Sequence, residues 1–525
     1  MKTPSIVPAA LSTATGPRRA AVRSRQGHAL AAGFALAVAS AALLGLGGCA
    51  SPAGIVPTAT LVTPAALELD ATDGAFPAVD SDWWRAFGDP TLDRLVDRAL
   101  AQGPSLKVAQ ARLARAEAAV AAARAAEGPD VKGQLDVTRE RFSANSIYPP
   151  PLGGGVFTLG NAQVGASYAF DLFGKNRAAI EAVVGSQRAA QADVGAARLL
   201  LASQVAHAYV QLGRLFAQRD VATRSLVERE QVLALIGQRV RGGLDTNVEL
   251  RLGESALPEL RQQVEQIDEQ IALIRHALAA LTAQPPNAHD ALVVTLRPVQ
   301  VVVVPEALPA ALLGRRADIS AARWRIAAAA GDVRSAKAGF YPNINLTAFA
   351  GLASIGLDRL VRAGSAQYGV GPALTLPIFD AGRLRANLRG KTADLDAAIE
   401  TYNGAVLAAV HDAADQVSAL RSIARQQHEQ ASAQAAAESA YDLATQRYRA
   451  GLSTYLTVLN AEAGVLTQRR IAADLAARAL DVQIALITAL GGGYADAPGS
   501  PAPAGPRAAR ASAPTYPAMP SGDRS

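Results

Sequence analysis

Cysteine is almost absent from this chain, because Cys49 is the single one among 525 residues. A disulfide framework is therefore excluded, and stability has to come from packing or assembly. An excess of one charge sign is also missing. The net charge is +6, but residues 1–49 supply five basic side chains and no acid, so the remainder lies near +1. With no basic block carrying interleaved aromatics, we expect no nucleic-acid partner.

Residue patterns that carry catalysis are also missing. No two of the six histidines stand at the i, i+4 spacing that would place them on one helix face for a metal. No glycine-rich phosphate loop follows a predicted strand, and no serine occupies a nucleophile-elbow setting. We therefore expect no catalytic, cofactor-binding or metal site and no enzyme activity.

Cys49 closes a segment with the order of a secretory signal. A basic stretch containing Lys2 and Arg25 precedes an apolar run that ends in Leu46-Gly47-Gly48-Cys49. This order is typical of a signal peptide, and its final cysteine makes it look like a bacterial lipoprotein signal. We expect residues 1–48 to be removed and Cys49 to receive a covalent lipid. The alternative is a transmembrane anchor with an incidental thiol, but the run is short for a span of ~20 residues.

The chain repeats itself at an offset of about 208 residues. Gln238–Thr246 matches Gln446–Thr454, and Phe170-Asp171 with Gly174 matches Phe379-Asp380 with Gly382. Such self-similarity indicates two copies of one structural plan. We predict a first repeat at 89–285 and a second at 315–492, joined by a linker at 286–314. Residues 49–88 form an N-terminal segment, and the Pro/Ala-rich tail 493–525 is expected to be disordered.

Each repeat contains two segments in which apolar and polar residues alternate. They lie at about 131–141, 162–172, 343–352 and 366–377. A period of two with one apolar and one wettable face favours membrane strands, with lipid outside and water inside. Four strands cannot close a barrel, since the smallest need ~8, whereas three copies would supply twelve. The alternative is an ordinary soluble hairpin packed on a helix.

Proline is missing from two long stretches, Lys175–Arg241 and Arg383–Ala450. Helices of that length reach ~100 Å at ~1.5 Å per residue. The stretches break at Gly242-Gly243 and at Ala450-Gly451, and the hydroxyls that follow, Thr246 and Ser453 or Thr454, can cap returning helices. Each repeat is therefore predicted to be a long helical hairpin whose tip lies far from the strands.

These features resemble the TolC-like outer-membrane efflux family, specifically the lipoprotein branch that serves RND-type pumps (the NodT/OprM-like group). The likeness runs from about Trp83 to Gly493. The motifs that carry it are Asp82-Trp83-Trp84, Phe87–Leu92, the two strand-to-helix junctions Phe170–Gly174 and Pro377–Arg383, Arg315–Ile319, Phe340-Tyr341-Pro342 and Arg447–Gly451. Ala317 stands where the family usually has proline.

The resemblance implies a mainly α protein with membrane β-structure. It implies a homotrimer with a twelve-stranded outer-membrane β-barrel, four strands per chain, continued by a long periplasmic α-helical barrel. A mixed α/β equatorial belt is implied for the N-terminal segment, for 286–314 with its Val301–Val304 run, and around Gly491. Family members passively conduct drugs or other small molecules delivered by an inner-membrane pump and a periplasmic adaptor. Ala50 after the lipidated cysteine agrees with sorting to the outer membrane.

The resemblance also assigns roles at the hairpin tips. Adaptor docking is implied for Gly242, Gly243, Leu244 and Thr246 of the first tip and for Ala450, Gly451, Leu452 and Ser453 of the second. The periplasmic gate is implied for the helix that follows, at Tyr455, Leu456, Thr457 and Asn460. Relatives often carry aspartate at the Asn460 position, so a neutral ring here argues against strong cation selectivity. The alternative is that Leu456 and Asn460 only pack between helices.

Two other functions stay open at this point. Within the conduit class, the chain could be the exit duct of a protein-secretion or metal-efflux system. In a different class, it could be a structural envelope lipoprotein that conducts nothing. The alternating strands disfavour a mere brace, because a brace needs no wet-faced membrane strands.

Overall fold

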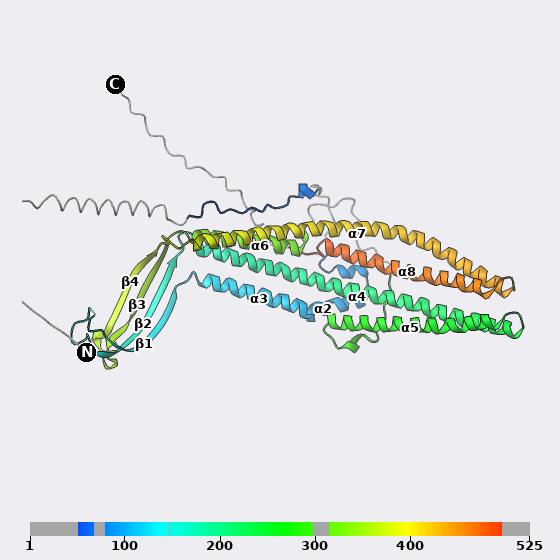
Figure 1. The fold of residues 1–525 in the computed structure, drawn as a ribbon, viewed down its shortest axis with the longest axis horizontal. Coiled ribbons are helices and arrows are strands. Elements are labelled where there is room, and N and C mark those ends of the chain that lie inside the picture. Colours follow the sequence, from blue (N-terminus) through cyan, green and yellow to red (C-terminus); the bar gives the residue numbers. More distant parts are fainter. Residues whose placement is uncertain (1–50, 68–78, 146, 298–313, 496–525) are drawn as a thin grey trace, which may run out of the picture.

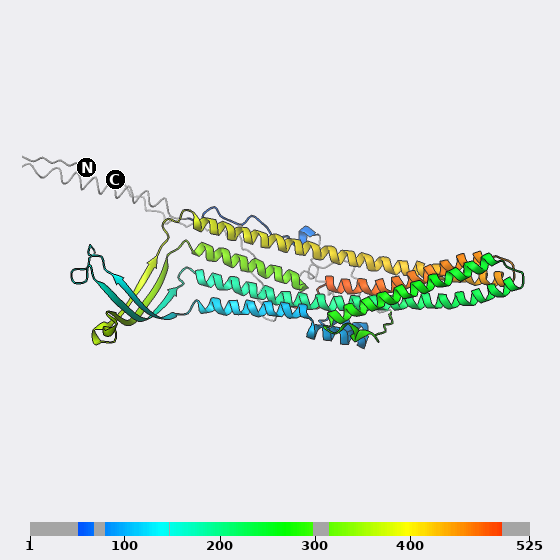
Figure 2. The ribbon, with the colours of Figure 1, turned by 60° about the horizontal axis from the view of Figure 1, so that its bottom comes forward.

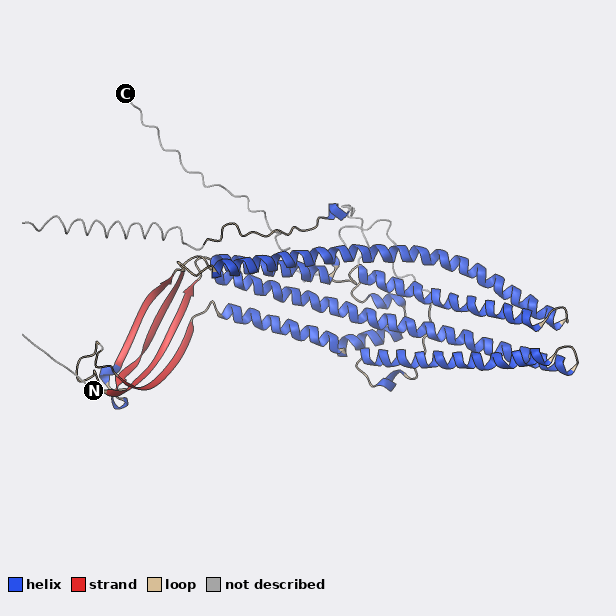
Figure 3. Ribbon diagram, viewed as in Figure 1, coloured by secondary structure: helices blue, strands red, loops and turns tan. Residues whose placement is uncertain are grey.

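The computed structural model describes residues 51–67, 79–145, 147–297 and 314–495. Figure 1 shows an elongated molecule with a small sheet at one end and long helices running away from it. Figure 3, coloured by secondary structure, shows the strands gathered at one end of the molecule and the helices filling the rest. The signal segment, Cys49, the Val301–Val304 run and the tail from residue 496 lie outside the described residues.

Four antiparallel strands form one sheet in the order β1-β2-β3-β4. They are β1 (Asp130–Arg141), β2 (Val156–Phe170), β3 (Asn343–Ile355) and β4 (Ala366–Thr375). The four predicted strands are present, but β2 begins six residues before the predicted 162 and so shortens the predicted long loop. In the part of the chain that the structure describes, β1 and β4 are the edges of the sheet and pair on one side only.

The two faces of the sheet differ in the way that the alternation predicts. One row across the sheet runs Val131–Ala166–Ala348–Val370, and the valines at its two ends are 63% and 75% exposed. The opposite face carries amides and acids, and Gln367 Nε2 donates to Asn161 Oδ1 at 2.9 Å across the width of β3. Among the residues that the structure describes, none covers this apolar row of the sheet face.

The helices repeat in both order and length. The first half contains α3 (Pro104–Ala125), α4 (Lys175–Arg241) and α5 (Asn247–Leu281), and the second contains α6 (Ala317–Ala338), α7 (Arg383–Arg449) and α8 (Tyr455–Ala489). Paired members have 22, 67 and 35 residues in each half. The two hairpins lie alongside each other in both views (Figures 1 and 2). None of the helices in the described ranges combines the length and apolarity needed to cross a membrane.

An aspartate fixes each passage from sheet to long helix. Asp171 accepts from the backbone N–H groups of Asn176 and Arg177 at 3.1 and 2.9 Å, at the start of α4. Asp380 accepts from the N–H groups of Gly382 and Leu384 at 3.0 and 2.8 Å, at the start of α7. A carboxylate in this place accepts hydrogen bonds from the free N–H groups of the first helical turn, and its negative charge interacts favourably with the positive end of the helix dipole. This explains why Phe-Asp recurs in both halves.

The N-terminal segment forms an extended strap along α7. Asp396 of α7 accepts from the N–H groups of Thr58 and Ala59 at 3.0 and 3.1 Å, and Arg385 donates to the carbonyl of Ser51. Ile55, 7% exposed, packs into an apolar cluster with residues of α6 and α7. Residue 51 is therefore held beside the start of α7, at the base of the sheet.

Where the belt was predicted, the described residues are helical or irregular. They contain the short 3-10 helices η1 (Pro64–Leu67), η2 (Trp83–Phe87) and η3 (Pro286–His289), and helix α2 (Pro90–Gln102) follows η2 at the start of the first repeat. No strand occurs in the described parts of 51–88 and 286–297, so the predicted β-component is not found there. The largest apolar core lies at this level, where Trp83 and Trp84 pack with α2, α4, α5 and α8.

Candidate gate and docking tips

Each hairpin tip turns on a glycine in the left-handed region. Gly243 has φ 72° and Gly451 has φ 76°, a conformation that costs glycine little and other residues more. The next N–H group closes the turn in both tips: Leu244 N–H donates to the Arg239 carbonyl at 2.9 Å, and Leu452 N–H to the Arg447 carbonyl at 2.8 Å. Both tips lie together at the end of the molecule farthest from the sheet (Figure 1).

The returning helices begin differently at the two tips. Thr246 caps α5, accepting from Val248 N–H at 3.1 Å, while Glu249 accepts from Thr246 N–H at 2.9 Å. This is a complete capping box. Thr454 occupies the N-cap position of α8 but makes no side-chain cap bond, and the buried Ser453 Oγ has no hydrogen-bond partner among the described residues. The cap predicted for the second tip is therefore wrong.

All but one of the predicted docking residues are exposed at the tips, and the exception is Ser453, whose hydroxyl is buried. Leu244 and Leu452 hold matching places, and each is 69% exposed. Gly242, Gly243, Ala450 and Gly451 are exposed as well. Each tip thus presents one exposed leucine at the far end of the molecule, whose burial by a partner would be favourable.

The predicted gate residues divide into two groups. Leu456, 56% exposed, lies on one face of α8 with Asn460 and Ala463, and Thr457 beside it is exposed too. Tyr455 is only 2% exposed and its ring lies 6.1 Å from that of Tyr448. Its assignment to the gate is therefore wrong, because its side chain is buried between the helices and cannot line an opening.

A hydrogen-bonded latch joins the two tips within one chain. Arg239 of α4 donates from Nε and Nη2 to the carboxylate of Asp245 at 2.9 and 3.2 Å, and from Nη1 to the Tyr448 carbonyl at 3.2 Å. The Tyr448 hydroxyl donates to the same carboxylate. Burial opposes ionisation of Asp245, but the bonds from Arg239 and Tyr448 outweigh it and lower its pKa. The latch therefore carries a stable carboxylate.

Farther from the tips than the latch, a buried ion pair connects α4 with α8. Arg229 Nε lies 2.8 Å from Glu462 Oε1, and the two side chains are 10% and 4% exposed. Arg229 Nη1 also donates to the Ala256 carbonyl of α5 at 3.1 Å. Burial raises the pKa of Glu462 although Arg229 opposes the shift. This one guanidinium holds three helices of the two hairpins together.

Further polar contacts continue along the same two helices. Arg469 of α8 binds Glu228 of α4 at 3.2 Å and Glu438 of α7 at 3.1 Å. His207 Nδ1 of α4 lies 2.8 Å from Asp481 Oδ1 of α8. Sequence reasoning missed the latch and these pairs. The available signal was the unlike chemistry of matched positions in the two repeats, such as Tyr448 opposite Val240 and Asp245 opposite Ser453.

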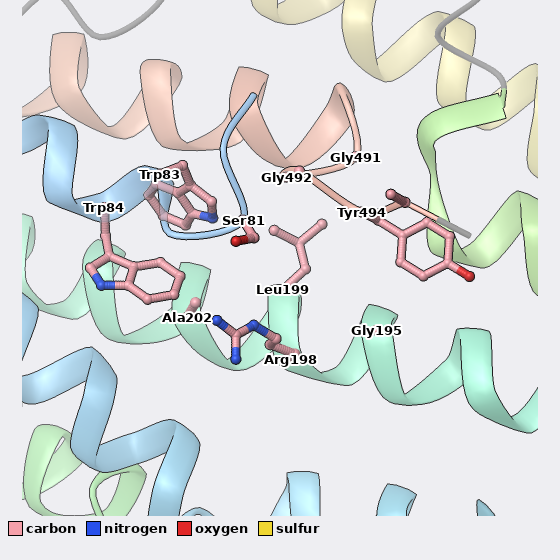
Figure 4. Close-up of a pocket in the computed structure, with 12 residues that line it drawn as sticks. Ser81, Trp83, Trp84, Gly195, Arg198, Leu199, Ala202, Gly491, Gly492 and Tyr494 are labelled. Atoms are coloured by element: carbon pink, nitrogen blue, oxygen red, sulfur yellow. The ribbon is translucent and has the colours of Figure 1, made fainter. Parts of the chain in front are cut away.

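A small cavity lies at the level of the core, far from the tips. It has a volume of about 160 Å³ and is lined by residues of the 81–84 segment, α4 and the Gly491–Gly493 turn (Figure 4). Its charged side chain, Arg198, is bound to Asp82 at 2.8 Å. Among the residues that the structure describes, no group of His, Cys, Asp or Glu side chains is arranged to hold a metal ion.

An uncovered apolar sheet, continued by two long helical hairpins of equal length, is the architecture of a TolC-like outer-membrane channel subunit. The chain belongs to the outer membrane efflux protein family, whose model matches residues 95–284 and 308–492. The predicted resemblance to this family is therefore confirmed.

Curated relatives are similar over most of the chain. The fusaric acid resistance protein FusA of Burkholderia cepacia is 37% identical over 68% of this chain and 68% of its own length. The multidrug resistance outer membrane protein MdtQ of Escherichia coli O157:H7 is 33% identical over 86% of this chain and 96% of its own length. The pyoverdine export outer membrane protein OpmQ of Pseudomonas aeruginosa is 33% identical over 78% of this chain and 87% of its own length.

Solved structures share the fold. The outer membrane protein VceC of Vibrio cholerae is 35% identical, with a TM-score of 0.74 over 79% of this chain and 100% of its own. The outer-membrane channel OprN is 26% identical, with a TM-score of 0.72 over 84% of this chain and 98% of its own.

Proposed function

We propose that three copies of this chain form a conduit through which small molecules leave the periplasm across the outer membrane. The observation that carries the proposal is the sheet. Its apolar face is exposed at Leu135, Tyr368 and Val370, which are 71%, 86% and 75% exposed. Water does not favour such a surface, whereas lipid does.

The free sheet edges require partners. Open edges are not tolerated in the hydrocarbon region, because every unpaired N–H and C=O group costs several kcal/mol there. Here β1 and β4 are free within the chain, and pairing β4 of one copy with β1 of the next closes a barrel. Three copies of four strands give twelve, which lies within the range of membrane barrels. The helical hairpins then continue the tube into the periplasm for ~100 Å.

The gate of this conduit is proposed at Leu456 and Asn460. Both lie on the exposed face of α8 near the tip, so three copies arranged about an axis would bring three of each together. The face carries no charged side chain from Leu456 to Thr467. A neutral constriction of this kind closes by apolar contact and discriminates little between ions of opposite sign.

The lipid on Cys49 is proposed as a second attachment to the membrane. Ser51 lies beside the start of α7, and α7 begins where β4 ends. Two residues of chain span at most ~7 Å, so a lipidated Cys49 would be placed at the level of the sheet base. In the proposed orientation this is the periplasmic leaflet of the outer membrane.

Partners and substrates follow from the relatives and the tips. The relatives are named for multidrug resistance, pyoverdine export and fusaric acid resistance, so we propose drugs or other small molecules as the cargo. The exposed leucines of the tips are proposed to receive a periplasmic adaptor, which links the conduit to an inner-membrane RND-type pump.

The test is the mass and shape of the detergent-extracted protein, measured by light scattering and negative-stain imaging. The proposal expects a trimeric cylinder with a helical part of ~100 Å and, in planar bilayers, channel conductance. A monomer, or a thin rod with no barrel at one end, would contradict it. A conducting particle of another copy number would keep the conduit and replace the trimer.

A further inference from the structure

The apolar face of the sheet has a limited height, and the inference drawn from it rests on the proposed insertion of the sheet into the outer membrane. On β2 this face takes every second residue from Phe170 at the base to Gly160 near the outer end, away from the helices (Figure 1). Ten positions at ~3.4 Å each, tilted by ~40°, cover ~26 Å along the membrane normal. Membrane barrels have an apolar band of ~25 Å. The hydrocarbon layer therefore ends at the level of Gly160 and its partner Val137.

Just beyond that level, β1 carries two arginines on the same face. Because side chains alternate along a strand, Arg139 and Arg141 follow Val137 on the lipid-facing side, while Glu140 lies on the wettable side. Both arginines are exposed, and neither takes part in an ion pair among the residues that the structure describes. Two cations without a counter-charge thus stand where the apolar face ends.

The loop between β3 and β4 folds toward this same corner of the sheet. Thr158 pairs with Arg139 on one side, and its carbonyl accepts from the N–H group of Gly356 at 2.7 Å on the other. Neighbouring strands lie ~4.8 Å apart, so the loop begins ~10 Å from the Arg139 backbone. A Cβ atom added to Gly160 would meet the Leu357 side chain at 2.9 Å. The loop therefore lies over the outer end of the lipid-facing side.

This loop carries more positive than negative charge. Arg359 Nε and Arg362 Nη2 lie 3.9 and 3.6 Å from the Asp358 carboxylate, so two exposed cations share one exposed acid. Among the described residues, this corner of the lipid-facing side thus holds four arginines and one aspartate, a net charge of +3 per chain. The four cations are here called the outer arginines: Arg139, Arg141, Arg359 and Arg362.

The opposite end of the same face has a different chemistry. At the base, Tyr168 and Phe170 are 39% and 40% exposed, and their rings lie 5.1 Å apart. Aromatic side chains of this kind flank the apolar band of membrane barrels. At the outer end, Phe157 lies on the wettable side instead, where its ring is 5.9 Å from that of Phe142. The lipid-facing side therefore has arginines at its outer end in the place that aromatic rings take at its base.

We propose that the outer arginines bind phosphate groups of lipid headgroups in the outer leaflet of the outer membrane. Guanidinium groups hold phosphate oxygens through paired, charge-assisted hydrogen bonds, and these four stand at the level where headgroups meet the hydrocarbon layer. Val361 of the same loop is 83% exposed, and it contacts the acyl chains beside the headgroup. In the proposed trimer β1 also pairs with β4 of the next copy, so a basic loop flanks the β1 arginines on both sides.

Binding of diphosphorylated lipid A to the purified full chain in a neutral detergent tests this, with thermophoresis as the readout. The double variant Arg139→Gln with Arg141→Gln should bind lipid A about thirtyfold more weakly than the parent, because each arginine at an anionic lipid surface contributes about fivefold. The difference should shrink in about 1 M salt, where charges are screened beyond ~3 Å. Equal binding by the variant and the parent at low salt would overturn the inference.

A matched control separates a lipid site from a general effect of charge. Arg112→Gln with Arg115→Gln removes two exposed arginines of α3, so it changes the net charge equally, and it should bind lipid A as the parent does. Equal weakening in the two double variants would overturn the inference. Inorganic phosphate at the same phosphate concentration should not displace lipid A, and displacement would show a site for free anions instead of lipid.

The proposed conduit is checked separately, so the two failures are distinguishable. Light scattering shows whether each variant has the mass of the parent, and the conductance of the parent is recorded in planar bilayers without lipid A. A parent that neither inserts nor conducts contradicts the conduit. A conducting parent whose binding of lipid A is unchanged by the loss of Arg139 and Arg141 contradicts the lipid site alone.

Discussion

The buried Arg229–Glu462 pair allows a quantitative prediction for Glu462→Ala. The partners are 10% and 4% exposed, so removing the carboxylate leaves an almost fully buried guanidinium without its counter-charge. Breaking a buried pair in this way costs about 3–5 kcal/mol, against about 0–1 kcal/mol for an exposed pair. A loss of about 3 kcal/mol corresponds to roughly a hundredfold change in an equilibrium constant.

Amide hydrogen exchange of the hairpins measures this loss, because it reports the free energy of local opening. In the purified protein, amides around 229 and 462 should exchange about a hundredfold faster in Glu462→Ala than in the parent. Glu230→Ala, which removes an exposed pair with Arg261, is the matched control and should change exchange less than about fivefold.

The double variant Arg229→Met with Glu462→Leu separates loss of the pair from loss of charge balance. Apolar replacements of similar volume are often neutral for a buried pair, so exchange in the double variant should return close to that of the parent. If Glu462→Ala exchanged no faster than the Glu230→Ala control, the pair would not hold the hairpins and the reasoning would fail.

Three further predictions concern the tip, the gate and the strap. The pKa of Asp245 is lowered, so the carboxylate of the latch is fully ionised above its ordinary pKa of about 3.9 and is protonated only as pH falls below that value. The conductance difference between Asp245→Ser and the parent should therefore hold from about pH 8 to about pH 5 and shrink below about pH 4. A conductance difference that disappeared above about pH 5 would contradict the latch. The Leu456→Ala protein should leak more than the parent in planar bilayers, while Leu443→Ala on α7 should leave the leak unchanged. Equal leaks in the two variants would remove Leu456 from the gate. Asp396→Ala removes a carboxylate that accepts hydrogen bonds from two backbone N–H groups of the strap, and each such bond to a charged group contributes about 1.5–3 kcal/mol. Limited proteolysis should therefore cut the strap faster in Asp396→Ala than in the control variant Asp394→Ala. Equal rates of cleavage would show that Asp396 does not hold the strap.

The long helices could be predicted from sequence because local chemistry sets their ends. The proline-free stretch Lys175–Arg241 is α4 with the predicted bounds, since glycines stand at both of its ends. The predicted start of β2 is wrong by six residues. Phe157 and Leu159 are apolar on the wettable face, so they interrupt the alternation from which a strand is recognised, although they pair with Glu140 and Thr138.

Contacts between hairpins could not be predicted from one sequence. Arg229 and Glu462 lie 233 positions apart, and only the register of two long antiparallel helices brings them together. Tyr455 shows the same limit within a single turn of helix. Its place in the gate motif did not reveal whether its ring faces the opening or the neighbouring helix, which depends on how the hairpins pack.

The equal lengths of the paired helices have a consequence for the shape of the far end. Because α4 and α7 both have 67 residues and α5 and α8 both have 35, the two tips of a chain end at one height. A closed ring of three copies would present a level rim to whatever docks there. Inserting turns into one hairpin alone would tilt that rim, so the reach of the tube can change without loss of its flat end only when both halves of the chain change by the same amount.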